Sequence, residues 1–508
     1  MIVIDGNHLT IDAIVAVARH YEKVQLSETA RAAVEEAHRW VEEIVAAGKP
    51  VYGINTGFGI FSDRQIAAED SAKLSRNLIL SHAICTGPAL PAEVVRAAML
   101  VRANTLSKGV SGVRLEIIET LLEMLNKQVT PVVPSQGSLG SSGDLGPLSH
   151  MALVLTTDDA DRDEDSGMAD YQGRVMTGKA AMAAAGIQRI KLGPKEGLAL
   201  NNGATFSAAI AALAVKDAYR LADAAEWALA LSFEAMLGAT NAFDDRIHQS
   251  RGQPGQIEVA SHVRDLISGS TLANAAGRVQ DAYSLRCAPV VQGAARDSLA
   301  FIKQVVEREI NAVTDNPLLF GARTALSGGN FHGEPVGMVM DFLGIAVAEM
   351  GAISERRTYR LTDGKLNAGL PPMLVDSPEA AGLNSGLMMP QYTAASLVLE
   401  NETLATPDTV HSLPTSGGQE DHNANAMTAA RHARQIVENV SHILAIELYT
   451  AARAVDLRLR LMPEGKLGEG TRSVYQSIRQ AVPYTAGDAW WEPEIEAVRR
   501  WIFSDHQG

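Results

Sequence analysis

The sequence predicts an all-α protein, and two observations lead to that class. Hydrophobic residues make up 46% of the 508 residues and aromatic residues only 5%, which is typical of aliphatic helix packing rather than of an aromatic-rich sheet. Long stretches rich in Ala and Leu also recur between short polar interruptions, at about 205–238, 288–313, 335–360, 391–405 and 425–460. Many of them exceed the average helix length of about 11–12 residues. We therefore expect long helices whose apolar faces pack together as a bundle.

A helix is predicted near the N-terminus, in the stretch SETARAAVEEAHRWVEEIVAAGKP at 27–50. Ser27 is a residue type that caps helix N-termini, whereas Gly48 and Pro50 are types that end helices. Between them, apolar residues recur at spacings of three and four, the period of one helix face. These residues are Val34, Ala37, Val41, Ile44 and Val45. We expect a helix that begins after Ser27 and buries this stripe.

The pattern of the chain changes between about residues 50 and 200, where Gly-rich and acidic stretches interrupt the helices. We expect a smaller, loop-rich N-terminal domain over 1–200, and a helical core with the C-terminal region over 201–508. The acidic run TTDDADRDEDSG at 156–167 is interpreted as a solvated loop, because its acidic residues and glycine miss the spacing of a calcium-binding loop. No period of 20–50 residues recurs, which disfavours a solenoid.

Charge and cysteine content limit the partners and the compartment. A net charge of −15 without a local basic patch predicts that the protein binds neither nucleic acid nor an anionic membrane. Two cysteines, Cys85 and Cys287, do not make a disulfide framework and agree with a reducing compartment. The first residues lack the pattern of a signal peptide, and no apolar run approaches the roughly 20 residues that span a bilayer. We expect a cytoplasmic protein.

One stretch, QGSLGSSGDLGPLSH at 136–150, holds four glycines and four serines inside this helical sequence. It is no Walker loop, because no Gly-Lys-Ser/Thr follows, and Gly140, Gly143 and Gly146 lack the dinucleotide-binding spacing. It resembles a nucleophile elbow only loosely. Histidines and cysteines do not cluster at metal-ligand spacing, so no metal site is predicted. Residue types alone leave open a surface turn, a phosphate cradle, or a backbone that itself becomes the reactive group.

The stretch resembles the cofactor-forming loop of the aromatic amino acid ammonia-lyases. Eight further segments resemble other blocks of that family and occur in the family's order: YGINTGFG, LSHAICTG, EGLALNNG, QDAYSLRC, NAVTDNPLLF, LSGGNFHGEPV, GLNSGLMMP and LPTSGGQEDH. The resemblance is greatest for the histidine-acting members. It implies an all-α fold of the L-aspartase/fumarase type, and a homotetramer in which each active site is built from three subunits.

The family makes its own electrophile, a type of group that side chains do not supply. The resemblance implies that the amide nitrogen of Gly143 attacks the carbonyl carbon of Ser141, and that loss of two waters turns Ser142 into the methylene of 4-methylidene-imidazol-5-one (MIO). No external cofactor is implied. Glycine suits the attacking position because it lacks a Cβ. The family commonly has Ala where this chain has Ser141, and that side chain stays outside the ring.

Other roles follow from the matching blocks. Tyr52 resembles the tyrosine that lies against the substrate and is the candidate catalytic base. Arg286 resembles the arginine that clamps the substrate carboxylate, a task for a forked guanidinium. Tyr283, which we expect to be catalytic, and Gln280 match the polar partners around the cofactor and the amine.

The remaining blocks concern the pocket and the substrate ring. Asn202 matches the asparagine that orients the cofactor oxygen and the substrate, and Phe331 matches a pocket wall. His82 resembles the selectivity histidine of histidine and tyrosine lyases, and an acid such as Glu420 can hydrogen-bond an imidazole or take part in proton transfer. Met388 also matches the histidine type. The resemblance thus implies elimination of ammonia from L-histidine to give urocanate, a step in histidine degradation.

The chain also departs from the family's pattern at Asn201, Cys85 and Ala282, where the family commonly has Leu, Gly and Pro. Asn201 adds a polar group that needs a partner if it is buried. These departures leave open an MIO-dependent lyase or 2,3-aminomutase acting on tyrosine, phenylalanine or a histidine analogue. Two other classes are a helical scaffold that no longer catalyses, which would have no need of the site residues, and a phosphate- or nucleotide-binding protein that uses the glycine loop.

Overall fold

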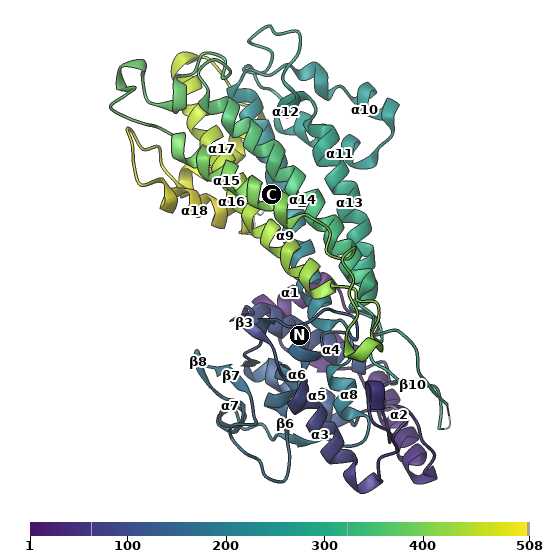
Figure 1. Ribbon diagram of the computed structural model, residues 1–508. Helices are drawn as coiled ribbons and strands as arrows, with labels where there is room; N and C mark the ends of the chain where they lie inside the picture. Colours follow the sequence, from purple (N-terminus) through teal and green to yellow (C-terminus); the bar gives the residue numbers. More distant parts are fainter. Residues whose placement is uncertain (62, 323, 505–508) are drawn as a thin grey trace. The chain divides into compact units, whose positions relative to one another are not determined.

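The computed structural model describes residues 1–61, 63–322 and 324–504, and within these ranges the chain is mainly helical (Figure 1). The helices before residue 205 are α1 Ile11–Arg19, α2 Glu28–Ala47, α3 Ser71–His82, α4 Ala92–Leu106, α5 Leu115–Lys127, α6 Leu145–Leu155, α7 Gly178–Ala184 and α8 Glu196–Asn201. The later helices are α9 Thr205–Ala235, α10 Asp245–Arg251, α11 Pro254–Leu266, α12 Tyr283–Arg286, α13 Ala288–Glu309, α14 Glu334–Thr362, α15 Met388–Leu404, α16 Ala426–Leu461, α17 Glu469–Ala481 and α18 Trp491–Phe503. The predicted all-α class is confirmed, and each of the long Ala- and Leu-rich stretches forms a helix.

The strands are short and pair only in small two- and three-stranded sheets among the described residues. They are β1 Ile2–Ile4, β2 Val24–Leu26, β3 Thr86–Ala89, β4 Val129–Pro131, β5 Pro134–Gln136, β6 Thr156–Thr157, β7 Met168–Tyr171, β8 Arg174–Thr177, β9 Ile190–Lys191, β10 Leu318–Leu319 and β11 Ala325–Leu326. β1 pairs with β2 and β6 with β9 in parallel, whereas β3–β5, β4–β7, β7–β8 and β10–β11 are antiparallel. These pairs join loops around the helices and do not form a core of their own.

The chain divides into two compact units that are each assembled from separate segments. The first unit contains 1–214, 303–341 and 407–431, and the second contains 215–302, 342–406 and 432–508. The first unit therefore takes two segments from beyond residue 200, the boundary expected from the sequence. All the strands and the Gly/Ser-rich stretch at 136–150 belong to the first unit.

The helix predicted after Ser27 is confirmed as α2. The Ser27 hydroxyl accepts a hydrogen bond from the Ala30 N–H at 3.2 Å, which satisfies one of the free donors of the first turn. Gly48 ends the helix in the left-handed conformation, with φ +67°. The buried stripe consists of Ala30, Val34, Ala37, Val41 and Ile44.

Three helices of the first unit, α3, α6 and α8, contact one another and support the Gly/Ser-rich stretch. Their apolar residues are buried, among them Leu78, Ile79, Leu148 and Leu200. Close approach of α3 and α8 depends on Gly197, because a Cβ at that position would lie 2.7 Å from the Ser75 carbonyl oxygen. A side chain there would separate the helices on which the candidate site is built.

The second unit packs its long helices around a buried ion pair. Glu447 of α16 accepts hydrogen bonds from Arg357 of α14 at 2.5 and 2.7 Å, and both side chains are fully buried. The same carboxylate accepts from Ser232 of α9 at 2.7 Å and from Ser354 of α14 at 2.6 Å. Four donated hydrogen bonds offset much of the cost of burying this charge, and they link three helices of the bundle (Figure 1).

Helix α14 is long and apolar enough to cross a membrane by length and composition, but 67% of its most apolar window is buried inside the protein. That burial is typical of a core helix. It is the one such helix among the residues that the structure describes.

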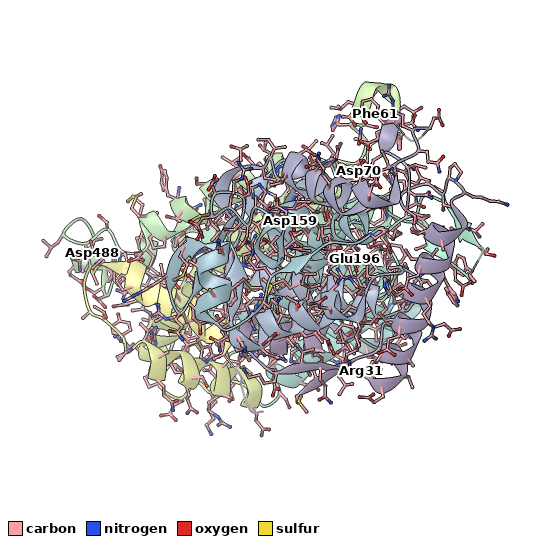
Figure 2. All side chains as sticks on the ribbon, turned by 90° about the horizontal axis from the view of Figure 1, so that it is seen from below. Arg31, Phe61, Asp70, Asp159, Glu196 and Asp488 are labelled. Atoms are coloured by element: carbon pink, nitrogen blue, oxygen red, sulfur yellow. The ribbon has the colours of Figure 1, made fainter. Side chains whose placement is uncertain are left out.

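The acidic run at 156–167 begins with β6, and its residues 158–167 form a loop that basic side chains hold in place. The Asp161 carboxylate pairs with Arg189 at 2.7 Å and with Lys179 at 2.9 Å. The side chain of Asp159, labelled in Figure 2, is 96% exposed and pairs with Lys191 at 2.5 Å. Most of the acidic side chains in the run at 156–167 reach solvent, as expected for a solvated loop.

Candidate active site

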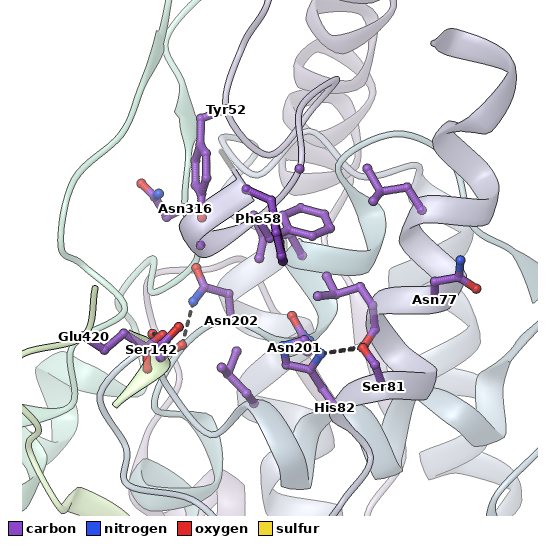
Figure 3. Close-up of a pocket in the computed structure, with 18 of the residues that line it drawn as sticks. Tyr52, Phe58, Asn77, Ser81, His82, Ser142, Asn201, Asn202, Asn316 and Glu420 are labelled. Carbon is purple, nitrogen blue, oxygen red and sulfur yellow. Dashed lines mark hydrogen bonds between the residues drawn. The ribbon is translucent and has the colours of Figure 1, made fainter. Parts of the chain in front are cut away.

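A cavity of about 750 Å³ lies beside Ser142 in the first unit (Figure 3). Its walls come from the segments at 52–61 and 64–66, from α3, from the start of α6, from α8 and from the segment at 416–420, together with Asn316 and Phe331. Six of the predicted site residues line it, namely Tyr52, His82, Ser142, Asn202, Phe331 and Glu420. The fold thus brings these residues together from segments that are far apart in the sequence.

A second cavity, of about 650 Å³, borders the same residues. It shares Tyr52, Ser142, Phe331 and Glu420 with the first and extends to His332 and His422. The rings of these two histidines stack with their centroids 6.0 Å apart. A ligand that reacts at Ser142 therefore has space in two directions.

Ser142 is held from both its side chain and its backbone. Its hydroxyl donates to Glu420 Oε1 at 2.6 Å. Its carbonyl oxygen accepts from Asn202 Nδ2 at 2.6 Å and from the Gly203 N–H at 3.3 Å (Figure 3). The predicted orienting role of Asn202 thus has a defined contact, and Glu420 contacts the hydroxyl that MIO formation would remove.

Gly143 occupies a position that admits no side chain. Its φ is +84°, and a Cβ there would lie 2.1 Å from the backbone nitrogen of Gly203. Gly143 and Gly203 pair as a parallel bridge, and the next residue, Asp144, donates its N–H to the Gly203 carbonyl at 2.9 Å. Close backbone pairing, together with the left-handed conformation, explains why glycine follows Ser142.

Asp144 is a functional candidate that the sequence analysis missed. Its buried carboxylate accepts from the Ser138 hydroxyl at 2.8 Å, and from the N–H and hydroxyl of Ser207 at 2.8 and 2.9 Å. Burial raises the pKa of Asp144, while these hydrogen bonds act in the opposite direction. Asp144 ties the end of the Ser-Ser-Gly segment, Ser141 to Gly143, to α9. The sequence signal that could have indicated this role is the acidic residue directly after the segment.

Ser141 makes contacts that alanine could not make. Its hydroxyl accepts from the Ala424 N–H at 2.9 Å and donates to the Leu139 carbonyl at 3.3 Å, and the side chain is buried. Ala424 lies four residues after Glu420, so this hydrogen bond joins the Ser-Ser-Gly segment to the segment that carries the acid. Serine in place of alanine at position 141 therefore adds a hydrogen bond to the segment that carries Glu420. Its side chain does not block the backbone atoms that would form the ring.

Tyr52 lies on the cavity wall, in the segment that continues to the exposed Phe61 at the outer edge of the first unit (Figure 2). Burial raises the pKa of the Tyr52 hydroxyl, and the negative charge of Glu420 adds to that effect, whereas the backbone of Gly59 opposes it. The phenol is therefore protonated at neutral pH, and its base form is a minor species.

His82 ends α3 with one ring nitrogen already engaged. Its Nδ1 lies 2.9 Å from the Leu78 carbonyl and 3.0 Å from the Ser81 hydroxyl (Figure 3). Because a carbonyl oxygen only accepts, Nδ1 carries the proton and Nε2 is left as an acceptor. Burial lowers the pKa of His82, which favours this neutral form.

Glu420 is fixed by a short backbone turn. Thr415 and Glu420 pair as an antiparallel bridge, and the Thr415 hydroxyl donates to Glu420 Oε2 at 3.1 Å. Since Oε1 accepts from Ser142, both carboxylate oxygens have defined partners. The side chain is therefore directed at Ser142 before any ligand binds.

Four predicted site residues do not line this cavity, because Gln280, Tyr283, Arg286 and Met388 belong to the second unit. Tyr283 is 70% exposed, and the Arg286 guanidinium lies over its ring at 4.7 Å. Arg286 Nε also donates to the Asp281 carbonyl at 2.9 Å. These contacts hold Tyr283 and Arg286 together at the surface of their own unit.

The other two departures from the family's pattern lie outside the cavity lining. The Cys85 N–H donates to His150 Nε2 at 3.1 Å, and burial raises the pKa of its thiol to about 11, so the thiol is not an activated nucleophile. Ala282 is the N-cap residue of α12. Nothing in the structure explains its replacement of proline.

Comparisons with known proteins show which proteins this chain is similar to. The family model described as aromatic amino acid lyase matches residues 9–480. A histidine ammonia-lyase of Caldanaerobacter subterraneus subsp. tengcongensis is 50% identical over 484 residues, which are 95% of this chain and 92% of that relative. The crystal structure of histidine ammonia-lyase from Trypanosoma cruzi is 36% identical with a TM-score of 0.89, covering 99% of this chain and 93% of that one. Pantoea agglomerans phenylalanine aminomutase is 32% identical with a TM-score of 0.92, covering 99% of both chains.

Proposed function

The chain belongs to the aromatic amino acid lyase family, and on that premise we propose that it eliminates ammonia from L-histidine to give urocanate. The observation that carries the proposal is the hydrogen bond from Ser142 to Glu420 inside a cavity that also holds His82 and Asn202. A helical scaffold would not need an acid directed at one serine of a glycine-rich segment, and the segment's backbone is paired with Gly203 rather than free to cradle a phosphate.

Ser141, Ser142 and Gly143 are the residues that would form MIO, and their surroundings fit it. A bond would form between the Gly143 nitrogen and the Ser141 carbonyl carbon, and the Ser141 carbonyl oxygen and the Ser142 hydroxyl would leave as two waters. Gly143 already lacks room for a side chain, and Asn202 already holds the Ser142 carbonyl. The group supplies an electrophile that no amino acid side chain provides.

The chain's own residues would carry the proton transfers. In the elimination, a β-hydrogen leaves as a proton, its bonding electrons form the double bond, and the amine departs as ammonia. Tyr52 lines the cavity and takes the β-proton at its phenolate oxygen, which requires prior loss of its own proton. Glu420 lines the same cavity, where it can hydrogen-bond the imidazole or the departing group.

The carboxylate clamp would come from another copy of the chain. Arg286 and Tyr283 are presented together at the surface of the second unit and do not line the cavity, so we assign them, with Gln280 and Met388, to sites completed by neighbouring subunits. We propose a homotetramer with shared active sites, as the family resemblance implies, and a location in the cytoplasm. Activity that persisted in a proven monomer would contradict it.

A 2,3-aminomutase is the second candidate, because aminomutases are among the solved structures that match nearly the whole chain. An aminomutase would return the ammonia to the β-carbon, using the same residues. A lyase and an aminomutase would therefore differ in their product and not in the MIO group.

Two measurements test the proposal. Intact mass should be lower than the sequence mass by two waters, and the deficit should vanish in Ser142→Ala. A panel of histidine, tyrosine and phenylalanine, followed by absorbance and by NMR of the products, should give urocanate from histidine. A full mass would refute the cofactor, whereas a β-amino acid product would replace the lyase by the aminomutase.

A further inference from the structure

Asn201 carries a polar atom whose partner is missing from the fold. The side chain is fully buried, yet it lines the cavity beside Ser142. Its Nδ2 donates to the Ser149 hydroxyl of α6 at 3.2 Å, whereas Oδ1 has no hydrogen-bond partner anywhere in the described ranges. A buried amide oxygen without a partner is costly, and leucine, the residue the family commonly has here, would avoid that cost.

A purely structural role explains the amide nitrogen of Asn201 but not its amide oxygen. The hydrogen bond to Ser149 ties α8 to α6, but this uses the amide nitrogen alone. The family fold exists with an apolar residue at this position, so the tie is not a condition for folding. The Oδ1 atom of Asn201 is therefore the acceptor that a ligand in the cavity could pair with.

His82 provides a second acceptor beside α6, the helix that Asn201 also contacts. Its carbonyl oxygen lies 3.6 Å from the position that a Cβ of Gly146 would occupy, and Asn201 contacts Ser149, which is three residues further along α6. Residues three apart lie on the same helix face. His82 Nε2 has no partner among the described residues, and both side chains line the same cavity.

Leucines make up part of the wall around this pair, beside the polar side chains of Asn77 and Ser81. Leu74 and Leu78 of α3, Leu145 of α6 and Leu198 of α8 line the cavity together with Asn201 and His82. A flat ring would fit against these leucines, and Asn201 Oδ1 and His82 Nε2 would offer acceptors to its polar edge. A phenyl ring would leave Asn201 Oδ1 buried and unpaired, whereas an imidazole N–H would satisfy it.

We propose that Asn201 is a specificity-determining residue whose Oδ1 accepts the ring N–H of the substrate, so that this pocket selects an imidazole that donates a hydrogen bond. The inference rests on the proposed function, because it assigns the ring end of the same substrate. The inference adds one contact to the proposed site, between the substrate ring and Asn201, a position at which the family commonly has leucine.

The test compares L-histidine with L-4-thiazolylalanine, whose five-membered ring keeps a ring nitrogen but has no N–H. The wild-type protein should favour histidine in kcat/KM. In Asn201→Leu, the ratio of the two kcat/KM values should fall by about 10- to 100-fold, because the lost hydrogen bond affects histidine only. Asn201→Ala, which introduces no larger side chain, provides a second variant with the same expected direction.

Controls separate this contact from general damage. Each variant must show the two-water mass deficit of the wild type, since Asn201 lies next to Asn202. Asn439→Leu, which removes a buried asparagine of the second unit that donates to Asn401 at 2.9 Å, should lower thermal stability and leave the ratio unchanged.

The outcomes distinguish the two proposals. An unchanged ratio in both Asn201 variants, with histidine still converted, would overturn the role of Asn201 and leave the lyase function intact. Equal wild-type activity on the two rings would also overturn it. Failure of the mature wild-type protein to convert histidine would instead overturn the proposed function.

Discussion

Glu447 in the bundle of the second unit and Asn201 in the cavity of the first unit are buried polar side chains with opposite surroundings. Glu447 is completely surrounded by donors from Arg357, Ser232 and Ser354. In the cavity, Asn201 Oδ1 and His82 Nε2 have no partner among the described residues. Glu447 holds three helices together, whereas Asn201 and His82 each keep an acceptor available for a ligand. Substitutions in the two regions should therefore separate stability from activity.

The largest effect is expected for Ser142→Ala, which removes the hydroxyl that MIO formation needs. Activity should fall by about 10³-fold or more, because no other group supplies the electrophile. The thermal midpoint should stay close to that of the wild type, since Ala retains the backbone contacts with Asn202 and Gly203. Activity of Ser142→Ala within tenfold of the wild type would contradict this prediction, because catalysis in the cavity would then not depend on the Ser142 hydroxyl.

Tyr52→Phe should lower kcat by about 10²- to 10⁴-fold, as expected for loss of a general base. In the wild type, kcat/KM should rise from neutral to alkaline pH, because the base form is the deprotonated phenol and its pKa is raised. The residual activity of Tyr52→Phe should lack that rise. The same pH profile in both proteins would assign the proton transfer to another group.

Arg357→Ala tests the opposite region. Removing one partner of a buried ion pair leaves the Glu447 charge uncompensated, so the free energy of unfolding should fall by about 3–5 kcal/mol. Denaturant unfolding at a fixed protein concentration measures this loss. Arg246→Ala is a matched control, since Arg246 is 91% exposed and pairs with Asp244 at the surface. A similar result for both would mean that the buried pair does not organise the bundle.

Ser141→Ala should have the smallest effect. It removes the hydrogen bond from the Ala424 N–H, which costs about 1–2 kcal/mol of unfolding free energy when the donor stays buried. Ring closure should persist, so the intact mass should still show the two-water deficit. Loss of that deficit would show that the Ser141 tether is required for maturation.

Much of the helical framework could be predicted from local patterns. The capping serine, the apolar spacing and the terminal glycine of α2 all lie within the helix or directly at its ends, so the local sequence contains the whole signal. The same holds for the long helices from α9 to α16. The assembly of each unit from three separated segments had no local signal, because contacts between distant segments decide it.

The candidate site divides in the same way. The order of the sequence blocks identified Tyr52, His82, Ser142, Asn202, Phe331 and Glu420, and all six line one cavity. It did not identify Asp144, whose importance depends on burial against Ser138 and Ser207. It also could not say what Ser141 contacts, because its partner Ala424 is 283 positions away.

By itself, the sequence determined which residue types are available: a Ser-Ser-Gly segment with freedom at glycine, an acid at 420, and an asparagine at 201. Only the tertiary structure decided that Glu420 faces the Ser142 hydroxyl and that Asn201 is buried with one oxygen unpaired. The physical reason is that helix propensity and capping act over a few residues, whereas hydrogen bonding and desolvation depend on what the whole fold places around an atom.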